Sequence, residues 1–135
     1  KVRAILKEAT AELVERYSDE VHGWLQDIAT PECPAEHIVA NLKRSRLSMW
    51  FCYAGNGRLI GIVLVSETTR GVLTFYGAAG DVMNEWATLD DDFVALAKAN
   101  GCGSFEFRGR RGFLRTFKQF GMREKYTVME RVIDA

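Results

Sequence analysis

The sequence has few prolines and histidines, few cysteines and no net charge. Its 135 residues include two prolines, two histidines and three cysteines, and eighteen basic residues balance eighteen acidic ones. A neutral chain creates no overall field that attracts nucleic acid or an anionic membrane. Cysteines without a CxxC pair favour a reduced compartment, so we expect a cytoplasmic protein. The spacing of His22 and His37 around Cys33 does not match a zinc site, and we expect no metal.

Long hydrophobic runs are also missing. No stretch approaches the roughly 20 apolar residues of a membrane span, and the charged start of the chain does not resemble a signal peptide. Low-complexity segments and flexible linkers are absent too. We therefore expect a single soluble domain over residues 1–135, long enough to bury one core.

The first half of the chain changes from helical to strand-like periodicity. Val2–Leu6 alternates weakly as a first strand, and apolar residues recur at helical spacing over Thr10–Ile28, in one or two helices. The prolines of Thr30–Pro34 interrupt this pattern, and Pro34 suits the start of a further helix that ends near Ser45.

Three strands are predicted next. Leu47–Tyr53 alternates in hydrophobicity and ends at Gly55-Asn56-Gly57, a strong hairpin-turn sequence. Leu59–Val65 is aliphatic, and after a turn at Thr69–Gly71 the strand-like pattern resumes at Val72–Tyr76. Adjacent strands with short turns predict antiparallel pairing.

The last third returns to a helical pattern. An apolar stripe that includes Trp86 and Phe93 predicts a helix that ends at Asn100-Gly101. A strand over Ser104–Arg108, a turn, a short helix with Phe113, Phe117 and Phe120, and a closing strand over Arg123–Ile133 follow. This order predicts an α+β (mixed α/β) fold, with helices on both faces of a mostly antiparallel sheet.

The order of elements resembles the GNAT superfamily, the Gcn5-related N-acetyltransferases, over nearly the whole chain. The run Gly-Cys-Gly-Ser-Phe-Glu-Phe at 101–107 and the aromatic segment 113–122 lie where that family places a strand and a late helix. The resemblance implies that the fourth strand splays from the fifth and that acetyl-CoA lies in the gap. It also implies a Q/R-x-x-G-x-G/A loop whose backbone N–H groups bind the pyrophosphate.

Three positions depart from the family pattern. The loop that should bind pyrophosphate has one glycine and two carboxylates, Asp81 and Glu85. One such charge about 4 Å from a phosphate costs on the order of 4 kcal/mol at an effective dielectric near 20. Phe117 stands where many members carry a tyrosine that protonates the leaving thiolate, and Arg110 where an asparagine is common.

These departures lead to the first functional hypothesis, a GNAT-fold protein that has lost, or largely lost, acetyl transfer. For such a protein we expect no cofactor. The Gly-Arg-Arg-Gly-Phe turn and the Met-x-x-Trp loop are similar to GNAT-like proteins of tailed bacteriophages, some of which lie inside the virion. The protein would then be a binding or structural component, such as a virion or ejection-associated protein, with a protein partner or a second copy.

The alternative hypothesis is an acyl-CoA-dependent N-acyltransferase of unusual type. Glu67 or Glu106 would act through water as the general base that deprotonates an amine. The competing interpretation for each is an exposed strand carboxylate paired with an arginine. Acetyl-CoA would be bound by backbone amides of the small residues Gly77, Ala78, Ala79 and Gly80.

A basic turn is the remaining candidate site. Arg108, Arg110 and Arg111 open a predicted helix and would bind an anion or a partner. Alternatively, they pair with acidic residues such as Asp81 or the run 90–92, in the same chain or in a neighbouring copy. A nucleic-acid interface would interleave exposed aromatics, whereas the nearby phenylalanines follow a core-facing period. We do not expect nucleic acid to be the partner.

Overall fold

The computed structural model describes residues 4–69, 71–81, 89–108 and 131. The predicted aromatic helix lies outside these residues, and so does the predicted closing strand apart from Arg131. In chain order the described elements are β1 (Ile5–Glu8), α1 (Ala11–Arg16), α2 (Ser18–Ile28), α3 (Ala35–Lys43), β2 (Leu47–Tyr53), β3 (Leu59–Thr69), β4 (Val72–Gly80), α5 (Asp90–Ala99) and β5 (Ser104–Phe107).

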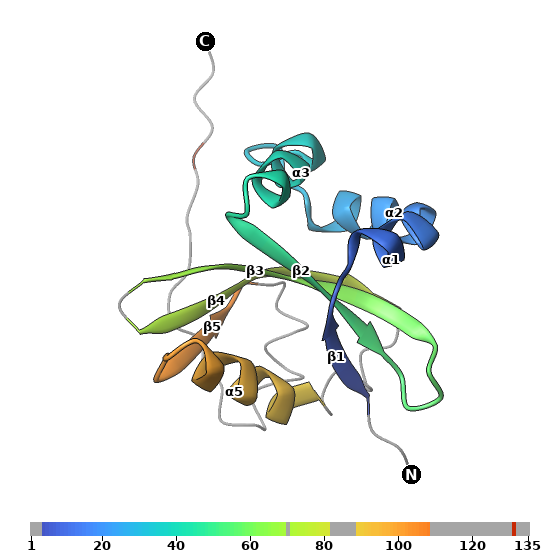
Figure 1. Ribbon diagram of the computed structural model, residues 1–135. Coiled ribbons are helices and arrows are strands. Elements are labelled where there is room, and N and C mark those ends of the chain that lie inside the picture. The colour runs from blue at the N-terminus through green and yellow to red at the C-terminus, as the bar shows by residue number, and fades with distance from the viewer. Residues whose placement is uncertain (1–3, 70, 82–88, 109–130, 132–135) are drawn as a thin grey trace.

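The strands form one sheet in the order β1-β2-β3-β4-β5 (Figure 1). The first four strands are antiparallel neighbours, and β5 runs parallel to β4. Helices α1 to α3 cover one face of the sheet and α5 covers the other (Figure 1). The predicted α+β class, with helices on both faces, is confirmed.

The sheet separates two hydrophobic clusters, and β3 contributes to both. Val63 and Val65 belong to the cluster under α5, whereas Ile62 and Leu64 belong to the cluster under α1 to α3. Alternate side chains of a strand point to opposite faces, so a strand that is covered on both sides must be apolar throughout. This explains the continuous aliphatic run in β3.

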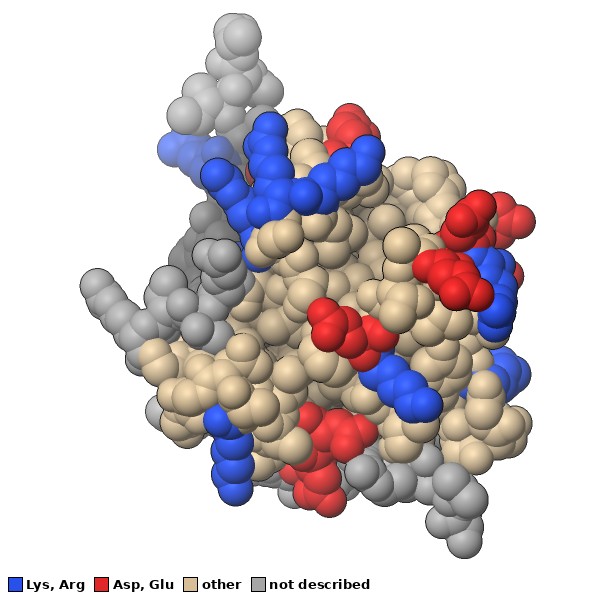
Figure 2. All heavy atoms as spheres, viewed as in Figure 1, with Lys and Arg blue, Asp and Glu red and all other residues tan. Residues whose placement is uncertain are grey.

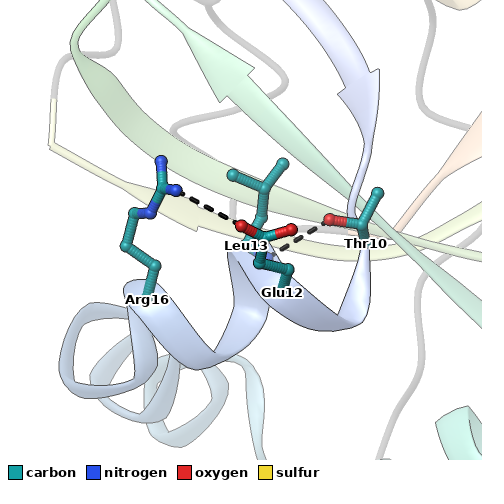
Figure 3. Close-up of polar contacts among 4 residues, drawn as sticks. All are labelled: Thr10, Glu12, Leu13 and Arg16. Atoms are coloured by element: carbon teal, nitrogen blue, oxygen red, sulfur yellow. Dashed lines mark hydrogen bonds and ion pairs between the residues drawn. The ribbon is translucent and has the colours of Figure 1, made fainter.

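Local capping fixes the start of α1. The Thr10 hydroxyl oxygen accepts a hydrogen bond from the Leu13 amide at 3.2 Å (Figure 3). The neighbouring ion pair between Arg16 and Glu12 is 3.6 Å long and exposed, so it adds only a few tenths of a kcal/mol. The predicted helical segment is divided at Tyr17, between α1 and α2.

Three predicted strand ends were wrong. β1 continues past Leu6 to Glu8, β4 continues past Tyr76 to Gly80, and β5 ends at Phe107, one residue before the predicted end at Arg108. Glycine and alanine have weak strand propensity, but pairing with the buried strand β3 outweighs that preference. The four small residues predicted to follow the strand therefore form its last part.

Gly77 allows α2 to approach the sheet. A Cβ atom at Gly77 would lie 2.6 Å from Cγ2 of Ile28, the last residue of α2. Ile28 is branched at Cβ, so this methyl group cannot move without shifting the side chain or the helix end. The missing side chain at Gly77 is thus a packing requirement.

We expect Gly77→Ala to lower the free energy of unfolding by about 1–3 kcal/mol, because the added methyl group overpacks the contact with Ile28. The penalty should largely disappear in an Ile28→Ala background, as measured by a double-mutant cycle with urea unfolding. Gly23→Ala is the matched control: nothing lies within 4 Å of its Cβ position, and we expect alanine to stabilise α2 there by roughly 0.5–1 kcal/mol. An equal penalty at Gly77 in both backgrounds would contradict the contact.

Candidate functional site

The pairing between β4 and β5 covers only the first half of β4. The parallel register runs from Val72↔Ser104 to Phe75↔Phe107, and the Arg108 amide adds a hydrogen bond to the Phe75 carbonyl at 3.0 Å. β4 itself continues to Gly80, paired there with β3. Among the described residues, β5 does not follow β4 beyond Phe75.

The register between β3 and β4 shifts at this same point. Leu64 pairs with Gly77 and Val65 pairs with Phe75, so Tyr76 is an extra residue on β4. Such a β-bulge bends the strand and redirects its side chains, and bulges are frequent next to active sites. The bulge lies where β4 and β5 part.

The hydrogen-bond pattern shows which amides of β4 face away from β3. The Asp81 amide donates to the Ile60 carbonyl at 2.9 Å, in register with the pairs Gly61↔Gly80 to Leu64↔Gly77. Successive amides of a strand point to opposite edges, so the amides of Ala78 and Gly80 point away from β3. We call Tyr76–Gly80 the open edge of β4.

Tyr76 lies at the start of the open edge. Its side chain is half-buried and shares a hydrogen bond with the Cys33 thiol. Burial, followed by this hydrogen bond, raises the pKa of Tyr76 to about 12, against a lowering effect of Arg108. Tyr76 therefore keeps its proton throughout the neutral range.

The loop between α2 and α3 holds Cys33 in this position. The Cys33 amide donates to the Thr30 hydroxyl oxygen at 3.1 Å, and the two backbones exchange hydrogen bonds of 3.1 Å. The two prolines of this loop end one helix and precede the next. A compact turn thus brings a thiol from the helical layer to the bulge in the sheet.

Of the two candidate bases, Glu106 is the one whose side chain the structure describes. It lies on β5, half-buried, and its Oε1 accepts a hydrogen bond from the Thr74 hydroxyl at 3.2 Å. The Ser66 hydroxyl in turn donates to the Thr74 carbonyl at 3.3 Å. These contacts hold the Glu106 carboxylate beside Thr74, one residue pair before the last pair between β4 and β5.

The other predicted site residues are only partly described. Glu67 lies in β3, in the irregular stretch after Ser66, and its side chain is outside the described part of the structure. Arg108 is exposed at the end of β5 and lies close enough to Tyr76 to lower its pKa. Arg110, Arg111 and Phe117 fall outside the described residues. The basic turn is therefore represented by its first arginine alone.

Sequence reasoning missed Tyr76, Cys33 and Thr74. Tyr76 was assigned to the end of a strand, and Cys33 was considered only as a metal ligand. No local pattern joins them, because the contact depends on the bulge and on the loop after α2. An aromatic residue just before a run of glycine and alanine was the available signal, since such runs permit close backbone approach.

The open edge fits a ligand with an extended amide chain. Backbone N–H groups at Ala78 and Gly80 can donate to carbonyl groups of a molecule laid along β4, as in strand addition. The pantetheine arm of acetyl-CoA has such carbonyl groups. Asp81, exposed directly after β4, is the one carboxylate of the predicted phosphate loop that the structure describes.

In the described part of the chain no helix is long and apolar enough to cross a membrane.

The sequence matches no protein-family model and no curated protein. Its similarity to known proteins is therefore structural.

Several solved structures of acetyltransferases share this architecture. An acetyltransferase from Trypanosoma brucei superposes with a TM-score of 0.63 at 16% identity, over 96% of this chain and 99% of that chain. Aminoglycoside 6'-N-acetyltransferase AAC(6')-Ih from Acinetobacter baumannii gives 0.61 at 13% identity, over 98% of this chain and 99% of that one.

An acetyltransferase from Bacillus subtilis, solved in complex with CoA, gives a TM-score of 0.63 at 21% identity, over 93% of this chain and 79% of that chain. The expected similarity to phage proteins is not shown by these comparisons. Identities this low establish the fold and nothing finer, and on that basis the chain has the GNAT acetyltransferase fold.

Proposed function

We propose that this protein is an acyl-CoA-dependent N-acyltransferase. The observation that carries the proposal is the open edge of β4, where backbone amides of Ala78 and Gly80 point away from β3 just beyond Tyr76. Amides with no hydrogen-bond partner in the described part of the chain, next to half-buried polar side chains, suit a ligand that is bound along its backbone and reacts at one end. The coenzyme, when bound, supplies an acyl group activated as a thioester.

Residues of the chain supply the general base and a hydrogen-bond donor. Glu106, oriented by Thr74, accepts through water the proton that the attacking amine loses. With a pKa of about 12, the Tyr76 hydroxyl is a much weaker acid than a thiol of pKa about 8.5, so it keeps its proton. On giving up its hydrogen bond to Cys33, the same hydroxyl would donate that hydrogen in a hydrogen bond to the departing sulfur. Tyr76 thereby supplies a hydrogen-bond donor, which the phenyl ring of Phe117 cannot supply.

A second candidate is the non-catalytic role, a binding or structural component such as a phage virion protein. The exposed carboxylate of Asp81 favours it, because it follows the open edge where a phosphate would approach. Phe117 and Arg110, outside the described residues, support the same hypothesis from sequence. Only this second candidate is compatible with a lack of coenzyme binding.

Titration calorimetry at low salt should show micromolar binding of acetyl-CoA to the full chain. Ala78→Pro should weaken it at least tenfold, because proline removes an amide on the open edge. The same change at Ala79 removes an amide that faces β3 and should instead unfold the protein, as seen by circular dichroism. No heat at millimolar acetyl-CoA would reject the acyltransferase and leave the non-catalytic role.

Kinetic variants test the assigned groups once a screen of amines has found an acceptor. We expect Glu106→Gln to lower kcat at least tenfold at unchanged affinity for CoA, because the amide cannot accept the proton. Tyr76→Phe should lower kcat severalfold without introducing a new pH dependence below pH 10, since Tyr76 stays protonated there. Glu67→Gln separates the two candidate bases, and Glu12→Gln on the exposed helix α1 is the control. Full activity of both Glu106→Gln and Glu67→Gln would contradict carboxylate catalysis.

A further inference from the structure

A pocket lies on the α5 side of the sheet, away from the open edge of β4. Its volume is about 500 Å³, within the range of small-molecule sites. The end of β1, the start of β2 and the last turn of α5 contribute to its walls, and the apolar floor includes Val65, Leu73 and Leu96. Leu73 precedes Gly80 by seven residues, roughly 23 Å along a strand, so the pocket and the far end of the open edge are well separated.

One end of this pocket is rich in hydrogen-bond donors. Ser45, Arg46 and Ser48 lie within four consecutive positions at the junction of α3 and β2. Arg46 is exposed, and no ion pair with another described residue engages its guanidinium. The Ser48 hydroxyl oxygen accepts from the Trp50 indole N–H at 3.2 Å, so its own hydrogen can be donated to a ligand.

The surroundings of this end are positively charged. Lys43 and Arg44, the last residue of α3 and its C-cap, are exposed next to Arg46. Figure 2 shows basic side chains gathered at the end of α3, above the uncharged surface that runs down to α5. An arginine with hydroxyl groups in a locally positive field is a typical arrangement for binding phosphate.

The opposite end has a different character. Glu8 is the one carboxylate among the described residues that line the pocket, and in the sheet register Glu8 lies beside Trp50. Arg46 and Trp50 are four residues apart, or roughly 13 Å along the strand, so the anion-binding end and the acceptor end are separated by the indole. A carboxylate at this end can accept hydrogen bonds from hydroxyl or amino groups.

We propose that this pocket binds a nucleoside monophosphate. The phosphate meets Arg46, Ser45 and Ser48, the planar base lies along Trp50 and the apolar floor, and Glu8 accepts from the hydroxyl or amino groups of the nucleoside. The pocket shares no residue with the open edge of β4, so this proposal does not depend on the proposed acyltransferase activity.

Titration calorimetry with adenosine 5′-monophosphate tests the proposal on the full chain at low salt. We expect saturable binding that is at least tenfold tighter than binding of adenosine or of inorganic phosphate, because each of these lacks one half of the ligand. Arg46→Ala should weaken binding at least tenfold. Arg58→Ala removes an equally exposed arginine from the turn between β2 and β3, outside the pocket, and should change it less than twofold.

Trp50 supplies an independent readout. Quenching of tryptophan fluorescence by the nucleotide should be lost in Trp50→Phe, with folding confirmed by circular dichroism. An absence of saturable binding, an affinity equal to that of inorganic phosphate or of adenosine, or indifference to Arg46→Ala would each overturn the proposal. Competitive displacement by acetyl-CoA would also overturn it, since the nucleotide would then occupy the open edge of β4.

Discussion

The extra residue in β4 is the constraint on which the candidate active site depends. Up to Phe75, β4 has a strand on each side, β3 and β5; beyond Tyr76 its described pairing is with β3 alone. The bulge changes which backbone groups face each edge of β4. The first half of the strand therefore pairs on both sides, and the amides of Ala78 and Gly80 in the second half point away from β3. Without the shift, the alternation of buried side chains along β4 would be reversed in half of the strand.

Packing against the helices depends on the same shift. Tyr76 and Gly77 both contact the helical layer, Tyr76 through Cys33 and Gly77 through the close approach of Ile28. Position 76 therefore carries a long polar side chain, whereas position 77 has no space for any side chain. The end of α2 and the loop that follows it are positioned by this pair, so the geometry around Tyr76 and the stability of the helix–sheet contact are physically linked.

Periodicity predicted the elements well because the core is sharply divided between two faces. The aliphatic run of β3 and the hairpin turn after β2 were recognisable locally, since the turn places Gly57 at a positive φ of 87° that suits glycine. The extension of β4 was missed because its small residues become a strand only through pairing with β3. The contact between Tyr76 and Cys33 was missed for a similar reason: it joins separate elements and leaves no trace in local spacing.

Because Asp81 is exposed, its electrostatic repulsion of a bound coenzyme is weaker than the sequence alone indicated. Two unit charges 4 Å apart interact by about 4 kcal/mol at a dielectric of 20, but by only about 1 kcal/mol in bulk water. Asp81 is solvent-exposed, so the lower value applies more closely, and salt screens it further. A penalty near 1 kcal/mol weakens binding about tenfold at most, which two or three backbone hydrogen bonds of roughly 1 kcal/mol each along the open edge can offset. Asp81 by itself therefore lowers the affinity for a phosphate-bearing ligand without abolishing it.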